Sequence, residues 1–339
     1  MSTINMRSTL GGFRAVANNA RTKAASKLAS PPVRSRSLVV RAKVEEPKET
    51  DEEPKTTSGV PAVPYTSPEP KTFFVKPDQA GDIAGASLPF AFRLASGGFT
   101  SGYNFAVAPN DDSKYSVARM AGQMVVETSI VAGFKRPAQP LVLYEFEACP
   151  FCKKVREACA ILDLDVMFYP CPKDSPNFRE EAIADGGKKM FPYLKDPNTG
   201  MSMYESDDIV QYLFNEYGDG EVPLPLSLGP VTSITAGLSL LGRMGRGMTY
   251  RDAITPEQPL EVWSYEASPF CKVVREVLVE LEIPHKMISC ARGSPKRQEM
   301  FEKKGLFQVP FLVDPNTGVE TFESAEIVEY LESTYGLKA

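Results

Sequence analysis

Clusters of apolar positions predict a short series of strands and helices from residue 141 onward. Residues 141–146 form an apolar run rich in Val, Leu and aromatic side chains, which is typical of a buried strand. Beyond Pro150, apolar residues recur at helical spacing from Val155 to Leu162, and a proline suits the first turn of a helix. The same reasoning predicts a strand over 166–169, a helix over 175–185, a hairpin of strands 192–195 and 202–204, and a helix over 206–218.

This pattern occurs twice in the chain. Residues 141–171 align without a gap to 260–290, and 12 of the 31 positions are identical. The match resumes between 191–218 and 309–336 after a shift of one residue. Each copy has the element order β-α-β-α-β-β-α, in which a right-handed crossover makes the first two strands parallel neighbours. The sequence therefore predicts an α/β protein with two tandem domains.

The segments outside the repeats differ in character. Residues 44–70 are rich in Pro and Glu, and the apolar stripe within 115–134 favours an amphipathic helix. We divide the chain into a transit peptide (1–41), a disordered acidic and proline-rich linker (42–70), an uncertain region with one predicted helix (71–138), domain 1 (139–219), a linker (220–258) and domain 2 (259–339).

The first residues of the chain are basic, contain Ser and Ala, and carry no Asp or Glu before Glu45. This composition is typical of an organellar transit peptide, and Val40-Arg41 before Ala42 resembles a chloroplast processing site. We expect a chloroplast protein, in the stroma or associated with thylakoids. The alternatives are import into mitochondria and a disordered basic arm on a cytosolic protein.

Composition excludes several classes of function. A net charge of −5 argues against nucleic acid as a partner, because phosphate binding needs a surplus of Lys and Arg. The single histidine, His285, argues against histidine-based catalysis and against zinc sites with histidine ligands. No window is long and apolar enough to predict a transmembrane span.

Cys149 and Cys152 form a Cys-Pro-Phe-Cys motif between the first strand and the first helix of repeat one. The partial positive charge at a helix N-terminus stabilises a thiolate, so Cys149 is the predicted nucleophile and Cys152 the resolving thiol. Glu145 and Glu147 would oppose a lowered thiol pKa if they lie close. A pair of packing cysteines or half of a zinc site is the structural alternative, although no second CxxC completes such a site.

Three motifs follow one another in the first repeat: Cys-Pro-Phe-Cys, then a Phe-Pro pair (Val-Pro in the second repeat), then a Glu-Ser pair at the last helix. With these motifs in this order, the sequence resembles the N-terminal domain of glutathione transferases and the related glutaredoxins. The resemblance covers 141–218 and 260–336 and implies a thioredoxin-like fold. The tandem arrangement resembles a plant and cyanobacterial two-repeat group. The Cys-Pro-Phe-Cys form also resembles omega-class transferases and a membrane-associated prostaglandin E synthase.

This resemblance implies a glutathione site in each copy. It would place the backbones of Phe191 and Val309 against the cysteinyl part of glutathione, each before a cis proline. Glu205-Ser206 and its counterpart would hold the γ-glutamyl end, although both serines also suit a helix N-cap. The implied glutathione-binding residues are Pro150, Phe151, Phe191, Pro192, Glu205 and Ser206 in the first copy, and Ser268, Cys271, Val309, Pro310, Glu323 and Ser324 in the second.

Ser268 replaces the nucleophilic cysteine in the second copy, so this copy is expected to be glutathione-binding or degenerate. No all-helical region of the length found in transferases follows either repeat in this sequence, which favours thiol–disulfide exchange over conjugation of bulky electrophiles. We expect a glutathione-linked oxidoreductase acting on protein or small-molecule disulfides, with glutathione as cofactor and no metal. The alternatives are a non-catalytic module that binds glutathione, a protein or a tetrapyrrole-like ligand, and a transferase completed by residues 71–138. The remaining cysteines, Cys159, Cys171 and Cys290, are expected to be buried packing residues.

Overall fold

A buried strand that leads into a helix opens each of the two repeats. The computed structural model describes residues 65–71 and 75–337. The predicted transit peptide and most of the predicted linker therefore lie outside the described residues. The elements of repeat one are β4 (Leu141–Glu145), α3 (Pro150–Ile161), β5 (Val166–Pro170), α4 (Phe178–Gly186), β6 (Tyr193–Asp196), β7 (Met201–Met203) and α5 (Ser206–Tyr217).

Repeat two has the same elements in the same order, so the predicted β-α-β-α-β-β-α order is confirmed. They are β8 (Leu260–Ser264), α8 (Pro269–Glu280), β9 (His285–Ser289), α9 (Lys296–Lys304), β10 (Phe311–Asp314), β11 (Val319–Phe322) and α10 (Ser324–Thr334). In both repeats the hairpin turn is closed by an aspartate, Asp196 or Asp314, whose carboxylate accepts the N–H of the asparagine two residues later at 2.8 Å.

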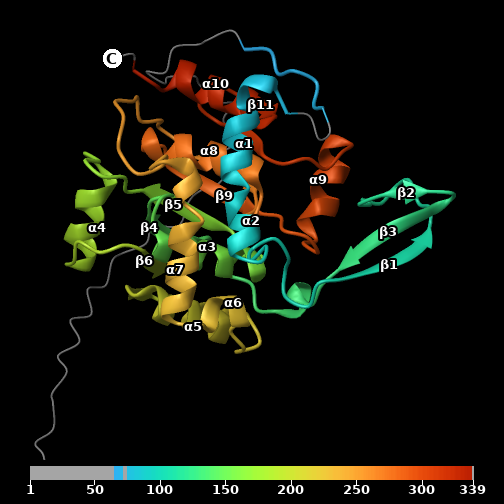
Figure 1. Ribbon diagram of the computed structural model, residues 1–339, viewed down its shortest axis with the longest axis horizontal. Helices are drawn as coiled ribbons and strands as arrows, with labels where there is room; N and C mark the ends of the chain where they lie inside the picture. Colours follow the sequence, from blue (N-terminus) through green and yellow to red (C-terminus); the bar gives the residue numbers. More distant parts are fainter. Residues whose placement is uncertain (1–64, 72–74, 338–339) are drawn as a thin grey trace, which may run out of the picture. The chain divides into compact units, whose positions relative to one another are not determined.

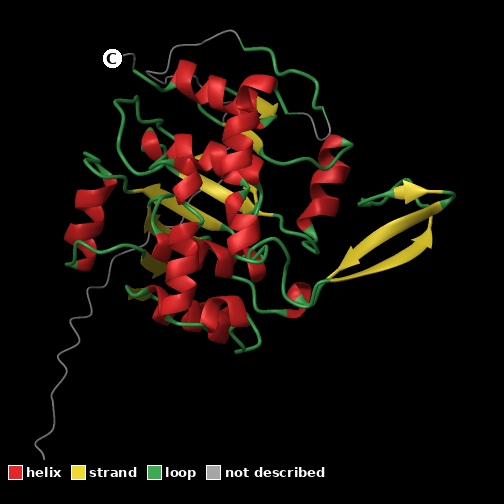
Figure 2. Ribbon diagram, in the orientation of Figure 1, coloured by secondary structure: helices red, strands yellow, loops and turns green. Residues whose placement is uncertain are grey.

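The strands of both repeats form one continuous sheet in the order β11-β10-β8-β9-β5-β4-β6-β7 (Figures 1 and 2). Within each repeat the first two strands are parallel neighbours, as the crossover rule predicts. The repeats meet where β5 pairs antiparallel with β9, with Val166 opposite Met287 and Phe168 opposite His285. Neither of these two strands is therefore left as an open edge.

Two helical layers cover each half of the sheet. Neighbouring residues of a strand point to opposite faces. Leu141 and Leu143 pack with α3 and α5 in one core, whereas Tyr144 packs with α4 in another. In repeat two, α8 and α10 pack together in the same way as α3 and α5. The loop after the first strand of each repeat, which carries the candidate chemistry, is thus fixed between two packed elements.

The stretch 115–134, predicted as an amphipathic helix, is instead part of an antiparallel sheet. Strand β3 pairs with β1 and with β2. The turn between β2 and β3 is made by Ala121 and Gly122, both at positive φ (51° and 73°), which favours a tight hairpin and not a helix. The Val and Met residues that suggested a helix lie in separate segments, with Met120 in β2, Met124 in β3 and Val131 in a 3-10 turn. The bounds are β1 (Asn104–Pro109), β2 (Arg119–Met120) and β3 (Gln123–Thr128), followed by the 3-10 turn η2 (Val131–Gly133).

A helical segment precedes each repeat. These segments are η1 (Pro77–Gln79), α1 (Ala80–Ala86) and α2 (Leu88–Phe92) before repeat one, and α6 (Leu224–Ser227), α7 (Pro230–Leu238) and η3 (Leu241–Arg243) before repeat two. Helix α1 packs on α8 of the second repeat and α7 packs on α3 of the first. Buried Arg93 pairs with Glu157 at 2.6 Å, and buried Arg243 pairs with Glu276 at 2.8 Å. Equivalent helical segments therefore pack against the first helix of each repeat.

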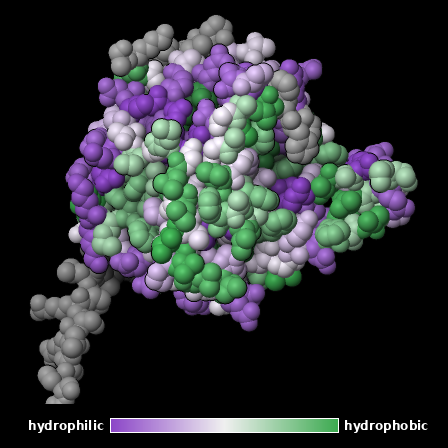
Figure 3. Space-filling model, viewed as in Figure 1, coloured by the Kyte–Doolittle hydropathy of each residue, from purple (hydrophilic) through white to green (hydrophobic). Residues whose placement is uncertain are grey.

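Exposed apolar side chains gather over α2, α6 and α7 on the face seen in Figure 3. Phe90, Leu224, Ile234, Leu241 and Met244 are all more than half exposed. Among the described residues, no helix combines the length and apolar character that crossing a membrane requires.

Candidate functional site

Cys149 lies at the N-cap of α3, directly after the loop that follows β4. Its backbone is extended (φ −89°, ψ 120°), and its Sγ accepts the backbone N–H of Cys152 at 3.2 Å. Pro150 occupies the first helical position, where no N–H is required. Cys149 is 4% exposed and Cys152 is fully buried. Both thiols of the motif are therefore buried, and Cys149 is the slightly more exposed of the two.

The two thiols titrate in opposite directions. Burial raises the pKa of Cys149, but the hydrogen bonds from the Cys152 thiol and backbone outweigh burial and lower it overall. Burial and the neighbouring Cys149 sulfur raise the pKa of Cys152 well above its ordinary value. A thiol with a lowered pKa is the better nucleophile near neutral pH. The arrangement fits Cys149 as the attacking sulfur and Cys152 as the second thiol.

A cleft of about 260 Å³ lies beside this motif in repeat one. The Phe191–Pro192 peptide bond is cis, as the resemblance implies. Ser206 is the first residue of α5 and Glu205 is its N-cap residue, so the interpretation of Ser206 and its counterpart Ser324 as N-caps is wrong. The cleft is lined by Phe151, Met190, Phe191, Pro192, Glu205 and Ser206.

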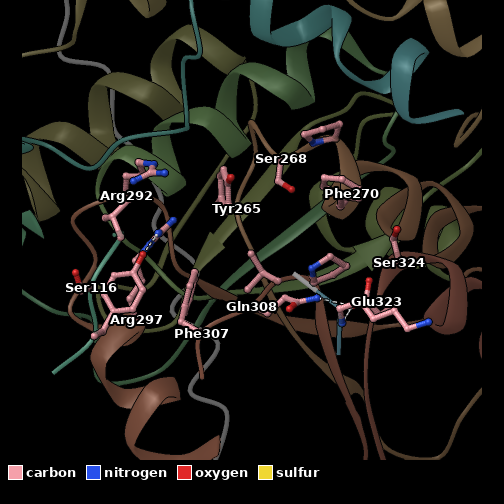
Figure 4. A pocket seen from close by; sticks show the side chains of 16 residues that line it. Ser116, Tyr265, Ser268, Phe270, Arg292, Arg297, Phe307, Gln308, Glu323 and Ser324 are labelled. Atoms are coloured by element: carbon pink, nitrogen blue, oxygen red, sulfur yellow. Dashed lines mark hydrogen bonds between the residues drawn. The ribbon is translucent and has the colours of Figure 1, made fainter. Parts of the chain in front are cut away.

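Repeat two has a larger cleft, of about 330 Å³, at the equivalent place (Figure 4). Ser268 takes the position of Cys149, and its Oγ accepts the N–H of Cys271 at 3.3 Å. The Val309–Pro310 bond is cis. Tyr115, Ser116 and Val117, which precede β2, line one part of the cleft, and the other lining residues include Tyr265, Phe270, Arg292, Arg297, Phe307, Gln308, Glu323 and Ser324.

Glu323 and Glu205 are equivalent in sequence but have different surroundings. Glu323 Oε1 accepts the Gln308 side-chain amide and the Lys71 backbone N–H, both at 2.6 Å. The chain before Lys71 runs beside β11, where the Tyr65 hydroxyl is 2.9 Å from Thr321 Oγ1. Within the described residues, no hydrogen bond to the Glu205 side chain is found. The carboxylate of repeat one is therefore the one available to a ligand.

Sequence reasoning missed an arginine in each cleft region. Arg179 donates to the carbonyls of Cys171 and Pro172 and lies 4.8 Å from the Phe191 ring. Arg297 donates to the equivalent carbonyls in repeat two and lies 4.4 Å from the Phe307 ring. The gap between the two aligned blocks falls just before these arginines, so they are out of register in an ungapped alignment. An alignment with the gap placed after Cys171 would have paired them.

A buried network of charged side chains joins the two repeats. Arg156 contacts Glu145, and it lies 3.1 Å from both Glu147 and Glu266. Although burial raises the pKa of Glu266, Arg156 and Arg275 bring it down to about 2. Burial raises the pKa of Glu145 to about 7 against the opposing effect of Arg156. The network comprises the carboxylates Glu145, Glu147, Glu157, Glu266 and Glu276 and the cations Arg93, Lys153, Arg156, Arg243, Lys272 and Arg275.

The other cysteines are packed in the interior. Burial raises the pKa of Cys159 to about 12, and it raises the pKa values of Cys171 and Cys290 further. Such thiols are poor nucleophiles. Across residues 65–71 and 75–337 no cluster of His, Cys, Asp and Glu is arranged to hold a metal ion.

Comparison with known proteins identifies the repeated unit. Residues 143–221 and 263–339 each match the family model for the glutathione S-transferase N-terminal domain, so the chain carries this domain twice. A glutathione S-transferase-like protein of Aspergillus fumigatus is 35% identical over 78 residues, which cover 23% of this chain and 34% of that protein. The chain thus matches about a third of the length of this curated relative.

Two solved structures are similar over part of the chain. A glutathione transferase of Bombyx mori is 27% identical, with a TM-score of 0.23, over 25% of this chain and 38% of that one. A trimeric glutathione transferase of Leishmania is 15% identical, with a TM-score of 0.23, over 60% of this chain and 68% of that one.

Proposed function

Because the chain carries two glutathione S-transferase N-terminal domains, we propose that it is a glutathione-linked thiol–disulfide oxidoreductase whose reactive sulfur is Cys149. The observation that carries this proposal is the hydrogen bond from the Cys152 N–H to Cys149 Sγ at the N-terminus of α3. It stabilises the thiolate form of Cys149 and keeps Cys152 directly behind it.

The reaction proceeds in two exchanges and a reduction. The Cys149 thiolate attacks a disulfide, forms a mixed disulfide with one sulfur and releases the other as a thiol. Cys152 then attacks Cys149 Sγ and releases the second thiol, which leaves a Cys149–Cys152 disulfide. Two glutathione molecules reduce this disulfide and leave as glutathione disulfide. Protein or small-molecule disulfides are the proposed substrates.

Repeat one would hold glutathione along its cleft. The Phe191 backbone, before the cis proline, would pair with the cysteinyl part. The Glu205 carboxylate would meet the ammonium group, and the N-terminus of α5 at Ser206 would receive the carboxylate. Phe151 of the Cys-Pro-Phe-Cys motif lines this cleft of about 260 Å³.

The experiment is a glutathione-dependent reduction assay on a small mixed disulfide. We expect Cys149→Ser to lower kcat/KM by roughly 100-fold or more. Cys290→Ala, which removes a packing thiol in repeat two, is the matched control and should keep its activity. Undiminished turnover by Cys149→Ser would overturn the proposal.

A second candidate function belongs to repeat two. Tyr115, Ser116 and Val117 supply a wall of its cleft, and Ser268 offers a hydroxyl where repeat one has a thiol. These features favour a transferase site, or a binding site for a glutathione-type ligand, completed by the segment 71–138. If it is a transferase, shortening the hairpin 104–128 should abolish conjugation of an aromatic electrophile and leave glutathione binding intact. Conjugation that survives this change would contradict the candidate.

Import into chloroplasts, and membership of the plant and cyanobacterial two-repeat group, are part of the same proposal. They are supported by the basic, acid-free composition of residues 1–44 and by the tandem arrangement. A fluorescent fusion of the whole chain should enter plastids, and a fusion that begins at Ala42 should not.

A further inference from the structure

Residues 65–71, which we call the strap, lie against the last hairpin and the last helix of repeat two. The Tyr65 ring packs edge-on against Tyr330 of α10, with 5.0 Å between the ring centroids. The Tyr65 hydroxyl is 2.9 Å from Thr321 Oγ1 in β11. Ser67 Oγ donates to a backbone carbonyl of β11, which is the outermost strand of this half of the sheet. The strap thus follows the edge of the sheet toward the second cleft.

The strap ends at the carboxylate that corresponds to Glu205 of repeat one. Glu323 Oε1 accepts the backbone N–H of Lys71 and the side-chain amide of Gln308, both at 2.6 Å. Figure 4 shows Gln308 and Glu323 side by side at the edge of the cleft. A glutathione molecule bound in this cleft would bring its ammonium group to the same carboxylate. The Lys71 N–H therefore occupies an acceptor that the ligand would need.

The strap also separates two cavities. Lys71, Glu323 and Ser324 line both the cleft of about 330 Å³ and a smaller cavity of about 60 Å³. Pro68 and Glu69 of the strap form another part of the wall of the smaller cavity. The residues that line the cleft of repeat one all belong to that repeat. The strap is therefore an addition to the second cleft from outside the domain.

The backbones that carry the two carboxylates have the same conformation. Glu205 (φ 65°, ψ 111°) and Glu323 (φ 69°, ψ 123°) are each the N-cap residue of the last helix of their repeat. A positive φ is uncommon for a residue with a side chain, and it occurs at both positions. The two subsites therefore differ in what surrounds the carboxylate, namely the strap and Gln308, where repeat one has Met190.

We infer that the strap occludes the ammonium subsite of repeat two, so that the second cleft binds a γ-glutamyl ligand such as glutathione only after the strap leaves Glu323. This inference rests on the proposed role of Glu205 and Glu323 in holding an ammonium group. The exchange involves no covalent step, because the ligand and the strap compete for one carboxylate.

The contacts of the strap suit reversible displacement. Each residue of 65–71 is half-buried or exposed, and the hydrogen bonds of Ser67 and Lys71 are open to solvent. A segment held by few, solvent-exposed contacts opens at a low cost in free energy. Because the strap is tethered to the domain, it nevertheless competes at a high local concentration. The apparent affinity of the second cleft is its intrinsic affinity multiplied by the fraction of molecules in which the strap is released.

Isothermal titration calorimetry of the full chain with glutathione tests this competition. Lys71→Pro removes the N–H that Glu323 accepts, and Lys71→Ala, which keeps this N–H, is the matched control. We expect Lys71→Pro to raise the affinity of the second cleft roughly 10-fold or more, which appears as an additional binding event. Tyr65→Ala removes the contacts at the other end of the strap and should have the same effect. The unsubstituted protein and Lys71→Ala should show the repeat-one event alone.

Binding at repeat one reports that each variant is folded, and a further substitution assigns the additional event. Glu323→Ala combined with Lys71→Pro should abolish the additional event and keep the first. Titrations of Lys71→Pro and Tyr65→Ala that equal that of the unsubstituted protein would overturn the inference, and so would an equally large gain in Lys71→Ala. If neither the unsubstituted protein nor any variant binds glutathione, the proposed glutathione site itself fails and this inference falls with it.

Discussion

Lys153, in helix α3 of the first repeat, lies with its Nζ 2.7 Å from Glu266 Oε1 of the second repeat, and both side chains are buried. Lys272 and Glu147 form the reciprocal pair at 2.8 Å. Each repeat thus neutralises a buried charge of the other. The two domains form a single charged core beside the strand pairing of β5 with β9.

The pair predicts a large stability cost when one partner is removed. Glu266→Gln removes from the buried network one carboxylate that pairs with Lys153, Arg156 and Arg275, so we expect the free energy of unfolding to fall by about 3–5 kcal/mol. Denaturant titration measures this free energy of unfolding. Glu299→Gln, in an exposed pair with Lys303, is the matched control and should change stability by less than about 1 kcal/mol. Equal effects of the two substitutions would contradict the account of the network.

Much of the fold follows from the sequence, because its strands and helices are set by local patterns of apolar residues and these patterns occur in both repeats. The network does not, because its partners come from different repeats: Lys153 and Glu266 are 113 residues apart. From the sequence alone, Glu145 and Glu147 stood out only as negative charges near Cys149. The structure shows that Glu147 is paired with Lys272 and Arg275, and that Glu145 raises the pKa of Cys149.

His285 predicts a loss of stability in acid. It is buried in β9, stacked on Phe168 across the seam, and burial lowers its pKa from 6.5 to about 4. Between these two values the unfolded chain binds a proton that the folded protein does not bind. The free energy of unfolding should therefore decrease as the pH falls from 6.5 to 4, by an amount on the order of 3 kcal/mol.

His285→Val, which copies Val166 of repeat one, should lose this part of the pH dependence. Denaturant titrations of both proteins at several pH values between 7.5 and 4 measure the difference. Parallel stability curves across that range would show that His285 does not titrate as described.

Glu205 and Glu323 predict different contributions to glutathione affinity. Glu323 already accepts hydrogen bonds from Gln308 and Lys71, whereas Glu205 is open to a ligand ammonium. We expect Glu205→Ala to weaken binding about 10-fold, and Glu323→Ala to have a smaller effect. Isothermal titration calorimetry with glutathione measures the dissociation constants of both variants. A larger loss from Glu323→Ala would assign the main glutathione site to repeat two.

The role of the region before repeat one could not be read from its sequence. The apolar residues in 115–134 fit a helical period, and Ala121 gives no sign of the positive φ that makes the hairpin turn. The sequence also does not reveal that Tyr115 lines the second cleft. Its partner there, Arg297, is more than 180 positions away along the chain. By contrast, both cis prolines and the N-cap position of Cys149 follow from motifs a few residues long.

The asymmetry of the two motifs predicts a single disulfide after mild oxidation. Cys149 and Cys152 are one helical turn apart, whereas Cys271 faces the hydroxyl of Ser268. Alkylation, digestion and mass mapping of oxidised protein should find the Cys149–Cys152 link alone and Cys271 as a slowly reacting thiol. Cys271 joined to Cys149 or Cys152 would instead indicate one composite site shared by both domains.

The central claim is that Cys149 forms the mixed disulfide with glutathione, and trapping that species tests it most directly. Cys152→Ser removes the thiol that would displace glutathione, so incubation with glutathione disulfide should leave one stable adduct per chain. Intact mass and peptide mapping should place this adduct on Cys149, and it should disappear in Cys149→Ser. An absent adduct, or one on a different cysteine, would contradict the account.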